Sequence, residues 1–404
     1  MSVQPLNVLV IGAGMYVCGS GTDSFGTILP TLVQEQHLGK LGKIHVSATR
    51  PESITQLQEK LAALNRLMGT KTHIQGYPTK GTRDTQAYKK ALEIVPRPAA
   101  AVISVPDHLH ASITRDVIKA GIPPLVVKPL TPTVPEALDL IQLLDQYQLY
   151  GAVEFHKRFD QANLLLRQKI RDGKLGDLCY VVVEYSQRRL IREIFHSWVS
   201  QTNIFQYLGV HYADLVYFVT GARPLRVLAT GQGNSRPAST KENPVYDAIQ
   251  VVVEWEIPPQ GKRFISTILT NWIDPNTTSA MSDQKITVAG TNGRYQSDQK
   301  HRGVQMVTEE GGLEDINPYF TQFYQDSETP LQTGVHGYGP ASIRCFLRDV
   351  ERLFAGTVSR QELMNHRPSF WQALPSTAVV EAVNRSLAQD SQWVSIDKQG
   401  RIEN

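Results

Sequence analysis

Short apolar runs alternate with longer amphipathic stretches over the first 150 residues. Leu6–Ile11 is almost continuously apolar, as is typical of a strand buried on both faces. The same pattern predicts further strands at Lys43–Thr49, Thr72–Tyr77, Pro98–Val105 and Leu125–Val127. It predicts helices between and after them at Ile28–Gln36, Ile54–Leu67, Thr82–Leu92, Ala111–Ala120 and Val134–Leu149. Strands that alternate with helices imply parallel crossovers, so residues 1–150 are predicted to form a doubly wound parallel sheet.

The pattern changes after Gly151, where long alternating strands follow one another with few helices between them. Strands are predicted at Cys179–Ser186, Leu225–Thr230, Ala248–Glu256, Phe264–Leu269, Lys285–Ala289 and Val304–Thr308. Helices are predicted at Gln161–Arg171, Phe205–Val219, Ser342–Ala355 and Ser376–Ala388, and loops at 234–245 and 310–340. Residues 151–404 are therefore expected to form a second α/β domain, built on a large and mainly antiparallel sheet that is open on one face.

Composition narrows the class of protein. The chain has 404 residues, which fits two domains, and 41 basic against 38 acidic residues leave a net charge of only +3. This balance argues against a dedicated nucleic-acid binder. Three widely spaced cysteines predict a reducing compartment without a disulfide framework. Because no leader or membrane-spanning stretch stands out, we expect a cytoplasmic protein with no membrane partner.

A glycine pair follows the first predicted strand directly. Gly12 and Gly14 have the Gly-x-Gly spacing that permits a tight turn and lets a pyrophosphate approach the backbone, with Met15 next in the chain. Val17 occupies the place of the usual third glycine, and more glycines follow, so the next helix is expected to begin late. The loop therefore indicates a dinucleotide site, although a plain glycine turn in another α/β fold would give the same letters.

The end of the second predicted strand bears on the choice of dinucleotide. An acid at this place usually binds the ribose of NAD, but here Thr49 and Arg50 precede the first acid. A hydroxyl and a guanidinium suit a 2′-phosphate, so NADP is favoured over NAD. The alternative is that Arg50 is an ordinary solvated side chain.

Polar residues end two further strands within Ala101–Pro129. One strand runs into Pro106-Asp107-His108-Leu109-His110, and the next ends in Lys128-Pro129. Here the chain resembles the glucose–fructose oxidoreductase, inositol dehydrogenase and MocA (Gfo/Idh/MocA) family, which has a Pro-Asn/Asp-x-x-His loop followed by a strand ending in Glu-Lys-Pro. The resemblance continues through Phe155–Phe159 and Gly209–Gly221 and becomes looser beyond about residue 225.

The resemblance implies an N-terminal Rossmann domain and NAD(P)-linked redox chemistry at a secondary hydroxyl of a sugar, sugar derivative or cyclic polyol. Lys128 would lie at the carboxyl end of a parallel strand, where ligands bind and where burial lowers the pKa of a lysine. Pro106, His108 and His110 would border the nicotinamide and its ribose beside Lys128. A His-x-His pair also suggests a metal, but no third ligand cluster is near, so no metal is expected.

One residue departs from the family pattern at this strand end. Val127 stands where the family has glutamate, so a charge partner of Lys128 or of the cofactor is lost. We therefore expect the pKa of Lys128 to fall further.

The predicted helix at Phe205–Val219 carries a histidine that matches the family. Leu208, Leu215 and Phe218 share a face at helical spacing and are expected in the core. Tyr207, His211 and Asp214 lie on an adjacent face.

In the family this histidine and an acid four residues earlier reach the substrate, whereas Tyr207 stands in the acid's place here. Lys128 and His211 are thus predicted to be the catalytic proton-transfer pair. Tyr207 would donate a proton or a hydrogen bond to the substrate. Asp214 would either orient His211 or form a surface ion pair.

Arg158 is a further candidate for binding substrate, although it could instead cap the next helix or pair with Asp160. The resulting hypothesis is an NADP- or NAD-dependent dehydrogenase of a carbohydrate-like substrate. Two alternatives stay open: an epimerase or glycoside-cleaving enzyme that recycles a bound cofactor, and a non-catalytic cofactor-binding sensor. By family analogy we expect a homodimer or homotetramer that forms through the C-terminal sheet.

Overall fold

The computed structural model describes residues 4–233, 245–327 and 331–403, and the chain divides into two compact units. The first unit comprises Met1–Leu130, Leu138–Phe159 and Tyr319–Gln372. The second comprises Thr131–Ala137, Asp160–Pro318 and Ala373–Asn404. The sequence predicted one division near residue 150, whereas in the structure a late segment of the chain returns to the first unit.

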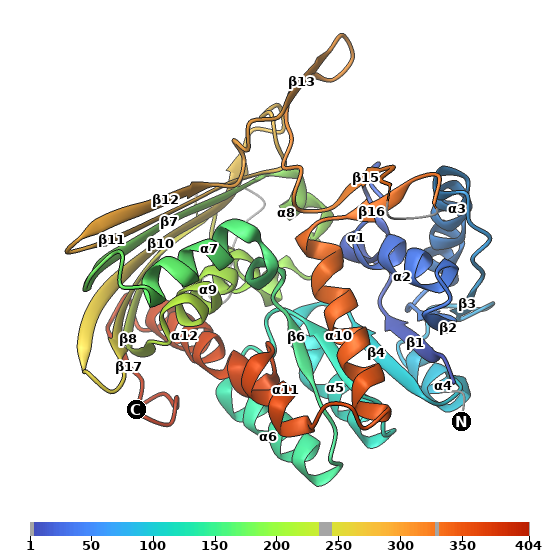
Figure 1. The fold of residues 1–404 in the computed structure, drawn as a ribbon, viewed down its shortest axis with the longest axis horizontal. Helices are drawn as coiled ribbons and strands as arrows, with labels where there is room; N and C mark the ends of the chain where they lie inside the picture. Colours follow the sequence, from blue (N-terminus) through green and yellow to red (C-terminus); the bar gives the residue numbers. More distant parts are fainter. Residues whose placement is uncertain (1–3, 234–244, 328–330, 404) are drawn as a thin grey trace. The chain divides into compact units, whose positions relative to one another are not determined.

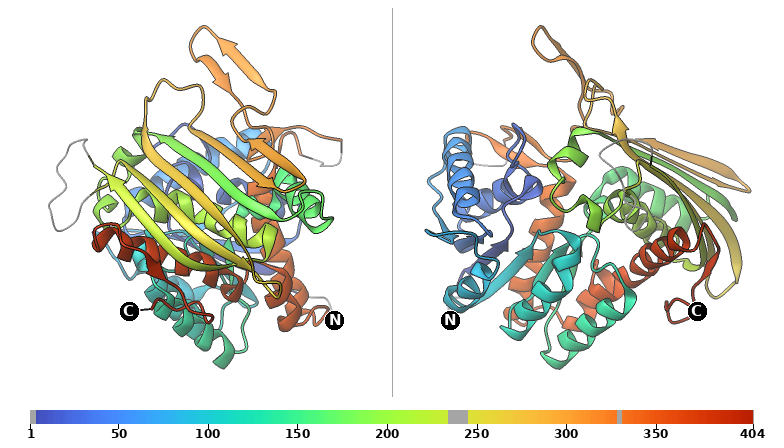
Figure 2. Two further views of the ribbon diagram at one scale, coloured as in Figure 1. Left: turned by 90° about the vertical axis from the view of Figure 1, so that its left-hand side faces the viewer. Right: turned by 180° about the vertical axis from the view of Figure 1, so that it is seen from behind.

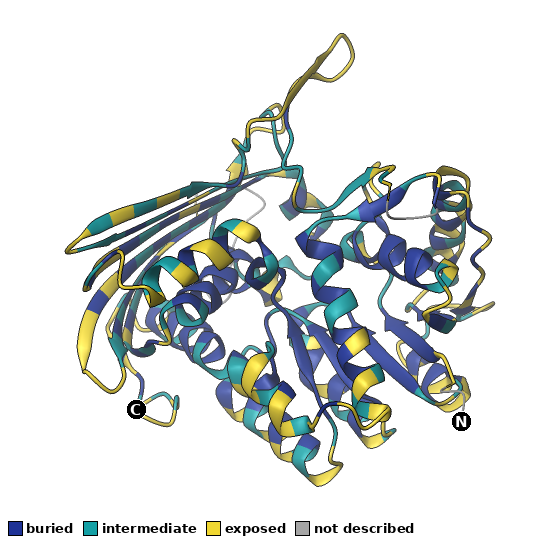
Figure 3. Cartoon of the chain, in the orientation of Figure 1, coloured by how far each residue is buried: buried dark blue, intermediate teal, exposed yellow. Residues whose placement is uncertain are grey.

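The first unit is built on a six-stranded parallel sheet (Figure 1). Its strands are β1 (Leu6–Ile11), β2 (Leu41–Ser47), β3 (Ile74–Tyr77), β4 (Ala99–Ile103), β5 (Pro124–Val127) and β6 (Ala152–Glu154). Their order in the sheet is β3-β2-β1-β4-β5-β6, and every pairing is parallel. The predicted doubly wound Rossmann-type sheet is therefore confirmed, and its central strands are buried throughout (Figure 3).

Helices connect these strands, and one early boundary differs from the prediction. The first helices are α1 (Met15–Cys18), α2 (Ile28–His37), α3 (Pro51–Met68), α4 (Ala87–Ile94), α5 (His110–Lys119) and α6 (Val134–Gln146). The expected start of α4 at Thr82 is wrong, because the carboxylate of Asp84 accepts a hydrogen bond from the Gln86 amide at 2.8 Å. The Asp84 amide also donates to the Thr49 carbonyl at 2.8 Å, which holds the segment before α4 out of the helix.

The late segment of the first unit adds α10 (Tyr338–Phe354), α11 (Arg360–His366) and the short pair β15 (Gln322–Tyr324) and β16 (Gly334–His336). Ile343, Phe346 and Val350 of α10 are buried in the same apolar cluster as the residues of β1 and β2. The Phe346 ring lies 6.1 Å from the ring of Tyr150. A helix that begins almost two hundred residues after the sheet ends thus completes its core.

A seven-stranded mixed sheet forms the second unit (Figure 2). Its strands are β7 (Leu178–Arg188), β8 (Arg223–Gln232), β9 (Ala248–Ile257), β10 (Lys262–Asp274), β11 (Ser282–Gly290), β12 (Gly293–Asp298) and β17 (Val394–Ser395). The order is β12-β11-β7-β10-β9-β8-β17, with only β7 and β10 parallel. The mainly antiparallel sheet is confirmed, whereas β12 had not been predicted.

Three helices of this unit cover one face of the seven-stranded sheet: α7 (Gln161–Arg171), α9 (Val210–Thr220) and α12 (Phe370–Ala388). The Ala229 amide on β8 donates to Ser386 Oγ of α12 at 2.9 Å, which ties helix to sheet. Shorter turns of helix are α8 (Leu190–Ile194), η1 (Asp107–Leu109), η2 (His156–Phe159), η3 (Val199–Gln201) and η4 (Phe205–Gly209).

Two loop predictions have different outcomes. The region 310–340 is not a plain loop, because β14 (Gly312–Asp315) pairs with β13 (Gln305–Thr308) in an exposed hairpin, and β15 and β16 lie farther along. Most of the other predicted loop, 234–245, lies outside the described residues. No helix in the described ranges is long and apolar enough to cross a membrane.

The turn after β1 requires glycine at one position. Gly12 has φ +114°, and a Cβ there would lie 1.9 Å from the Ser104 carbonyl oxygen. Gly14, two residues later, has φ −84° and open space where a Cβ would be. Only the first of the two glycines is thus needed for the fold itself.

Gly12→Ala is expected to lower the free energy of unfolding by at least about 2 kcal/mol, because the new Cβ overlaps backbone in a strained conformation. Gly14→Ala is the matched control and should cost no more than about 1 kcal/mol. Urea denaturation followed by circular dichroism measures both values. Equal stability of the two variants would contradict the close approach of Ser104.

Candidate functional site

The predicted site residues lie in two groups, one in each unit. The first group surrounds the carboxyl ends of β1, β2, β4, β5 and β6, where ligands of doubly wound sheets bind. The second group lies on η4 and α9.

The glycine loop opens on a single turn of helix. Gly14 is the N-cap residue of α1, and Met15 is its first residue, so both predicted positions lie at the end of β1. The helix stops at Gly19, and α2 does not begin until Ile28, as the run of glycines predicted. Val17 is 1% exposed and belongs to the core. The usual third glycine permits close packing of a long helix on the strand, and this one-turn helix has no such need.

Thr49 and Arg50 follow β2, and both are exposed. Arg50 has an extended backbone and immediately precedes α3. Its guanidinium makes no ion pair with any described residue, whereas the Thr49 carbonyl is occupied by the Asp84 amide. The structure therefore leaves the Arg50 side chain available to a ligand at the end of β2.

The loop after β4 holds Pro106, His108 and His110 in different environments. Pro106 precedes η1, and His108 Nδ1 is buried without a hydrogen-bond partner among the described residues. The His110 ring lies 2.7 Å from the Pro129 carbonyl through Nδ1 and 3.0 Å from the Val105 carbonyl through Nε2. Both ring nitrogens of His110 thus face backbone, and burial lowers its pKa. His110 contacts the backbone of the Lys128–Pro129 turn. His108, in contrast, has a ring nitrogen that can form a hydrogen bond with a ligand.

Lys128 follows β5 and is partly buried. Burial lowers the pKa of its ammonium to about 7, because the charged form loses solvent. The carboxylates of Asp107 and Glu154 act in the opposite direction and favour the ammonium. An amine that titrates near neutral pH can both accept and donate a proton, as general acid–base chemistry requires.

Glu154 ends β6 and is 1% exposed. Its Oε2 lies 3.0 Å from His156 Nδ1, and its Oε1 accepts a hydrogen bond from Ser342 Oγ of α10. The Tyr16 hydroxyl, from α1, lies 3.5 Å from the same nitrogen of His156. Burial, followed by the charge of Glu154, raises the pKa of Tyr16, which therefore stays protonated. These contacts connect the turn after the glycine loop, the end of β6 and the start of α10.

Aromatic rings enclose His156 on several sides. Its ring lies 6.1 Å from that of Tyr16, 5.8 Å from that of Tyr338 and 5.2 Å from that of Phe320. The imidazole is thereby held in one orientation against Glu154.

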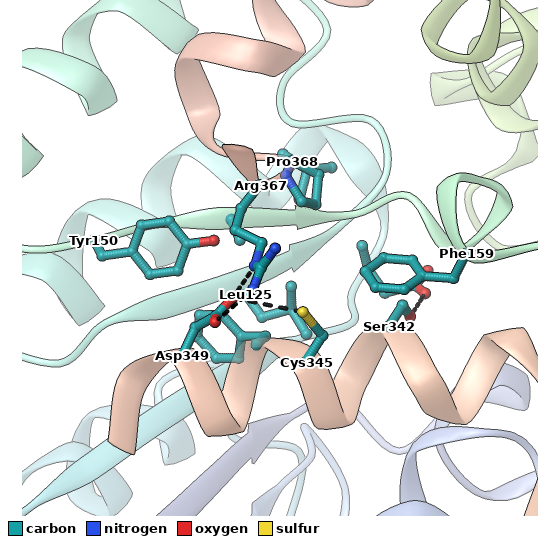
Figure 4. A pocket seen from close by; sticks show the side chains of 12 residues that line it. Leu125, Tyr150, Phe159, Ser342, Cys345, Asp349, Arg367 and Pro368 are labelled. Atoms are coloured by element: carbon teal, nitrogen blue, oxygen red, sulfur yellow. Dashed lines mark hydrogen bonds and ion pairs between the residues drawn. The ribbon is translucent and has the colours of Figure 1, made fainter. Parts of the chain in front are cut away.

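A small cavity lies next to this network, and Arg367, Asp349 and Cys345 contact one another in its wall (Figure 4). It is lined by residues of β5, β6, α10 and the segment after α11, among them Leu125, Glu154, Ser342, Cys345, Asp349 and Arg367. Arg367 donates two hydrogen bonds to Asp349, and Cys345 Sγ lies 3.5 Å from the same carboxylate. Burial raises the pKa of the Cys345 thiol to about 11. Arg367, Asp349 and Cys345 are thus paired with one another in the wall of the cavity.

The second group contains His211 and Tyr207. His211 lies near the start of α9 and is 3% exposed, and Asp214, one turn later, is 1% exposed. The alternative that Asp214 forms a surface ion pair is therefore wrong. Tyr207 lies in the preceding π-helical turn, so its offset from His211 is not the α-helical one that the spacing implied. Its ring contacts Phe195 at 4.9 Å, and burial raises its pKa, so it acts as a hydrogen-bond donor.

Arg158 is buried in the first unit, within η2. Its Nη2 donates to the Gln372 carbonyl at 3.3 Å, and its guanidinium lies 5.6 Å from the Phe155 ring. Asp160 caps α7 and pairs with Arg302 at 2.9 Å. Asp160 thus already has partners of its own.

Sequence reasoning missed Tyr16, Ser342 and the link from Glu154 to Lys128. Val127 is the last residue of β5, and Glu154 is the last residue of β6. This shared position at the ends of neighbouring parallel strands is the signal that could have placed the two residues side by side. Nothing in the local pattern marks Ser342, which lies almost two hundred residues away. Among the described residues, no group of three or more His, Cys, Asp or Glu side chains is arranged to hold a metal ion.

Two family models match the chain and together cover more than half of it. Residues 39–155 match an oxidoreductase family with an NAD-binding Rossmann fold, and residues 164–296 match the GFO/IDH/MocA C-terminal domain.

Named relatives are distant in sequence. The rhizopine catabolism protein MocA of Rhizobium meliloti is 23% identical over 54% of this chain and 65% of that protein. An oxidoreductase of Schizosaccharomyces pombe is 25% identical over 54% of this chain and 60% of that protein. The chain thus spans less than two thirds of the length of both. An inositol 2-dehydrogenase of Rhizobium meliloti strain 1021 is 22% identical over 88% of this chain and 96% of that protein.

The fold is shared with solved structures. Scyllo-inositol dehydrogenase of Lactobacillus casei, solved with NAD(H) and scyllo-inositol, superposes with a TM-score of 0.65 at 14% identity, over 97% of this chain and 99% of that one. GenD2 of gentamicin A biosynthesis, solved with NAD, has a TM-score of 0.66 at 19% identity, over 98% of both chains. The parallel sheet with its glycine turn, the lysine–proline strand end and the two matching family models lead to one conclusion: the chain belongs to the Gfo/Idh/MocA oxidoreductase family.

Proposed function

We propose that this chain is an NAD(P)-dependent dehydrogenase that acts on a secondary hydroxyl, or the matching ketone, of a cyclic polyol, sugar or sugar derivative. The observation that carries the proposal is the partly buried Lys128 at the carboxyl end of β5, whose pKa lies near 7. Family membership supports the redox class, and inositol is the substrate named for two relatives.

The residues around the glycine turn fit a dinucleotide. The open space beside Gly14 lets a phosphate approach the backbone, and a side chain there would fill it. The unpartnered Nδ1 of His108 and the exposed side chain of Arg50 are further groups that a bound dinucleotide would satisfy. We assign Gly12, Gly14, Met15, Thr49, Arg50, Pro106, His108 and Lys128 to this site, with His110 holding the turn.

The chain's own residues supply the proton chemistry. When bound, the nicotinamide provides the hydride acceptor for the carbinol carbon. The neutral amine of Lys128, or the imidazole of His211, accepts the hydroxyl proton as the carbonyl forms, and the protonated forms return it in the reverse direction. Tyr207 and Arg158 would hydrogen-bond the substrate.

Preference for NADP is the finer part of the proposal. It rests on Arg50, which pairs with no described residue, and on the absence of an acid directly after β2. A guanidinium there can bind the 2′-phosphate through two parallel hydrogen bonds.

Assembly through the open face of the seven-stranded sheet is a further part. Tyr180 and Ile265 are register partners on β7 and β10, and they are 44% and 47% exposed. Two large apolar side chains side by side on a helix-free face suit contact with a second copy in a homodimer or homotetramer. The three cysteines are free, in keeping with the cytoplasmic location that we propose.

The cofactor is tested by titration with NADPH and NADH, followed by tryptophan quenching. We expect tighter binding of NADPH, and Arg50→Ala should weaken it at least about tenfold while changing NADH binding little, because only NADPH carries the 2′-phosphate. Arg66→Ala, at the other end of α3, is the control. If Arg50→Ala weakens the binding of NADPH and NADH equally, Arg50 does not bind the 2′-phosphate. If denaturing the purified protein releases a dinucleotide, the alternative of a recycled, bound cofactor is favoured.

Lys128→Met should lower kcat/KM for polyol oxidation about 100-fold to 10,000-fold, since the proton acceptor is lost. In the native protein, the rate of oxidation should rise with pH through about 7, because the amine replaces the ammonium there. Lys119 is an exposed lysine of α5, and the control Lys119→Met should change neither kcat/KM nor its pH dependence. An unchanged profile in Lys128→Met would assign the proton step to His211 alone.

Assembly is tested by size-exclusion chromatography with light scattering. We expect a dimer or tetramer, and Ile265→Glu should shift it to a smaller species by placing a charge on the apolar contact. Ile94→Glu, at a residue that is 57% exposed in the first unit, is the control. A monomeric native protein would refute this part of the proposal.

A further inference from the structure

The family motif Glu-Lys-Pro is incomplete in this chain, but a carboxylate lies one strand away. Position 127 carries valine, and its register partner on the neighbouring parallel strand is Glu154. Paired residues of adjacent parallel strands lie about 5 Å apart and point their side chains to the same face of the sheet. The carboxylate of Glu154 therefore lies on the sheet face to which a glutamate at position 127 would have pointed.

The carboxylate of Glu154 is buried and makes contacts with two polar side chains. It is 1% exposed, yet its oxygens lie against His156 Nδ1 at 3.0 Å and the Ser342 hydroxyl. A buried carboxylate needs such hydrogen bonds to remain charged. Tyr16 adds a protonated phenol on the same side.

The carboxylate of Glu154 interacts electrostatically with the ammonium of Lys128. The groups that act electrostatically on the ammonium are Asp107 from η1, Glu154 from β6 and His110 from α5. Asp107 has the larger effect of the two carboxylates, and its Oδ1 already accepts a hydrogen bond from the His108 amide at 2.9 Å. The two carboxylates oppose the effect of burial, which by itself favours the neutral amine.

We infer that Glu154 is a positioning residue for Lys128: its carboxylate, supplied from β6, replaces the glutamate missing at position 127 on β5. The sequence alone predicted a lost charge partner, whereas in the structure that charge comes from the next strand. The catalytic role of Lys128 rests on the proposed function, but the electrostatic link between Glu154 and Lys128 does not.

The link can be measured without any cofactor or substrate. Protein labelled with [ε-13C]lysine is titrated by NMR, and the Lys128 signal is assigned by its loss in Lys128→Met. Glu154→Gln keeps the shape and hydrogen-bond acceptor but removes the charge, so the midpoint of the Lys128 titration should fall by about one pH unit. Glu35→Gln is the control, because Glu35 is also a buried glutamate of the first unit, paired with Arg344 at 2.8 Å, and does not act on Lys128.

A swapped variant, Val127→Glu/Glu154→Val, moves the carboxylate back to β5. In this swapped variant, Lys128 should titrate with the same midpoint as in the native protein. The swapped variant therefore tests the inference if Glu154→Gln does not fold. If the enzyme is active, the alkaline limb of kcat/KM for ketone reduction should move to lower pH in Glu154→Gln by the same amount, since the ammonium is lost earlier.

If Glu154→Gln folds and its Lys128 titrates at an unchanged midpoint, the inference is overturned. If Glu154→Gln does not fold, a lowered Lys128 midpoint in the swapped variant would overturn it. A shifted midpoint in a protein that binds no dinucleotide would refute the proposed function and leave the inference standing.

Discussion

A partly buried ammonium at the end of a parallel strand is the constraint around which the first unit is organised. Losing water disfavours the charged form of Lys128, and nearby negative charge opposes that effect. Asp107 and Glu154 provide it from the two neighbouring strand ends. Their opposition to burial leaves the pKa near 7, where the side chain can exchange a proton in either direction.

The same constraint explains contacts that look unrelated along the chain. The carboxylate of Glu154 is buried, so it requires hydrogen-bond donors of its own, and Ser342 of α10 is one of them. The N-terminal part of α10 is therefore tied to the site, while Ile343 and Phe346 pack into the core. Core packing and site electrostatics use one helix, so a change in either is expected to affect the other.

Much of the fold followed from local pattern. Continuous apolar runs identified the strands of the doubly wound sheet, and alternation identified most strands of the mixed sheet, because side-chain periodicity reflects which faces are buried. Short elements such as β12, β15 and β16 were missed. They have few residues in which a period can show, and tertiary contacts rather than propensity hold them in place.

Local sequence patterns were enough to identify the class of the molecule: the order of strands and helices, the glycine turn, and the lysine–proline strand end that marks the family. These features are local, so neighbouring letters suffice to reveal them. The electrostatics of the site, in contrast, depend on the three-dimensional arrangement of the chain. The register of β5 against β6 places Glu154 beside Val127, and the return of α10 supplies Ser342. A pKa depends on charges and solvent exclusion through space, and residues far apart in the chain decide both.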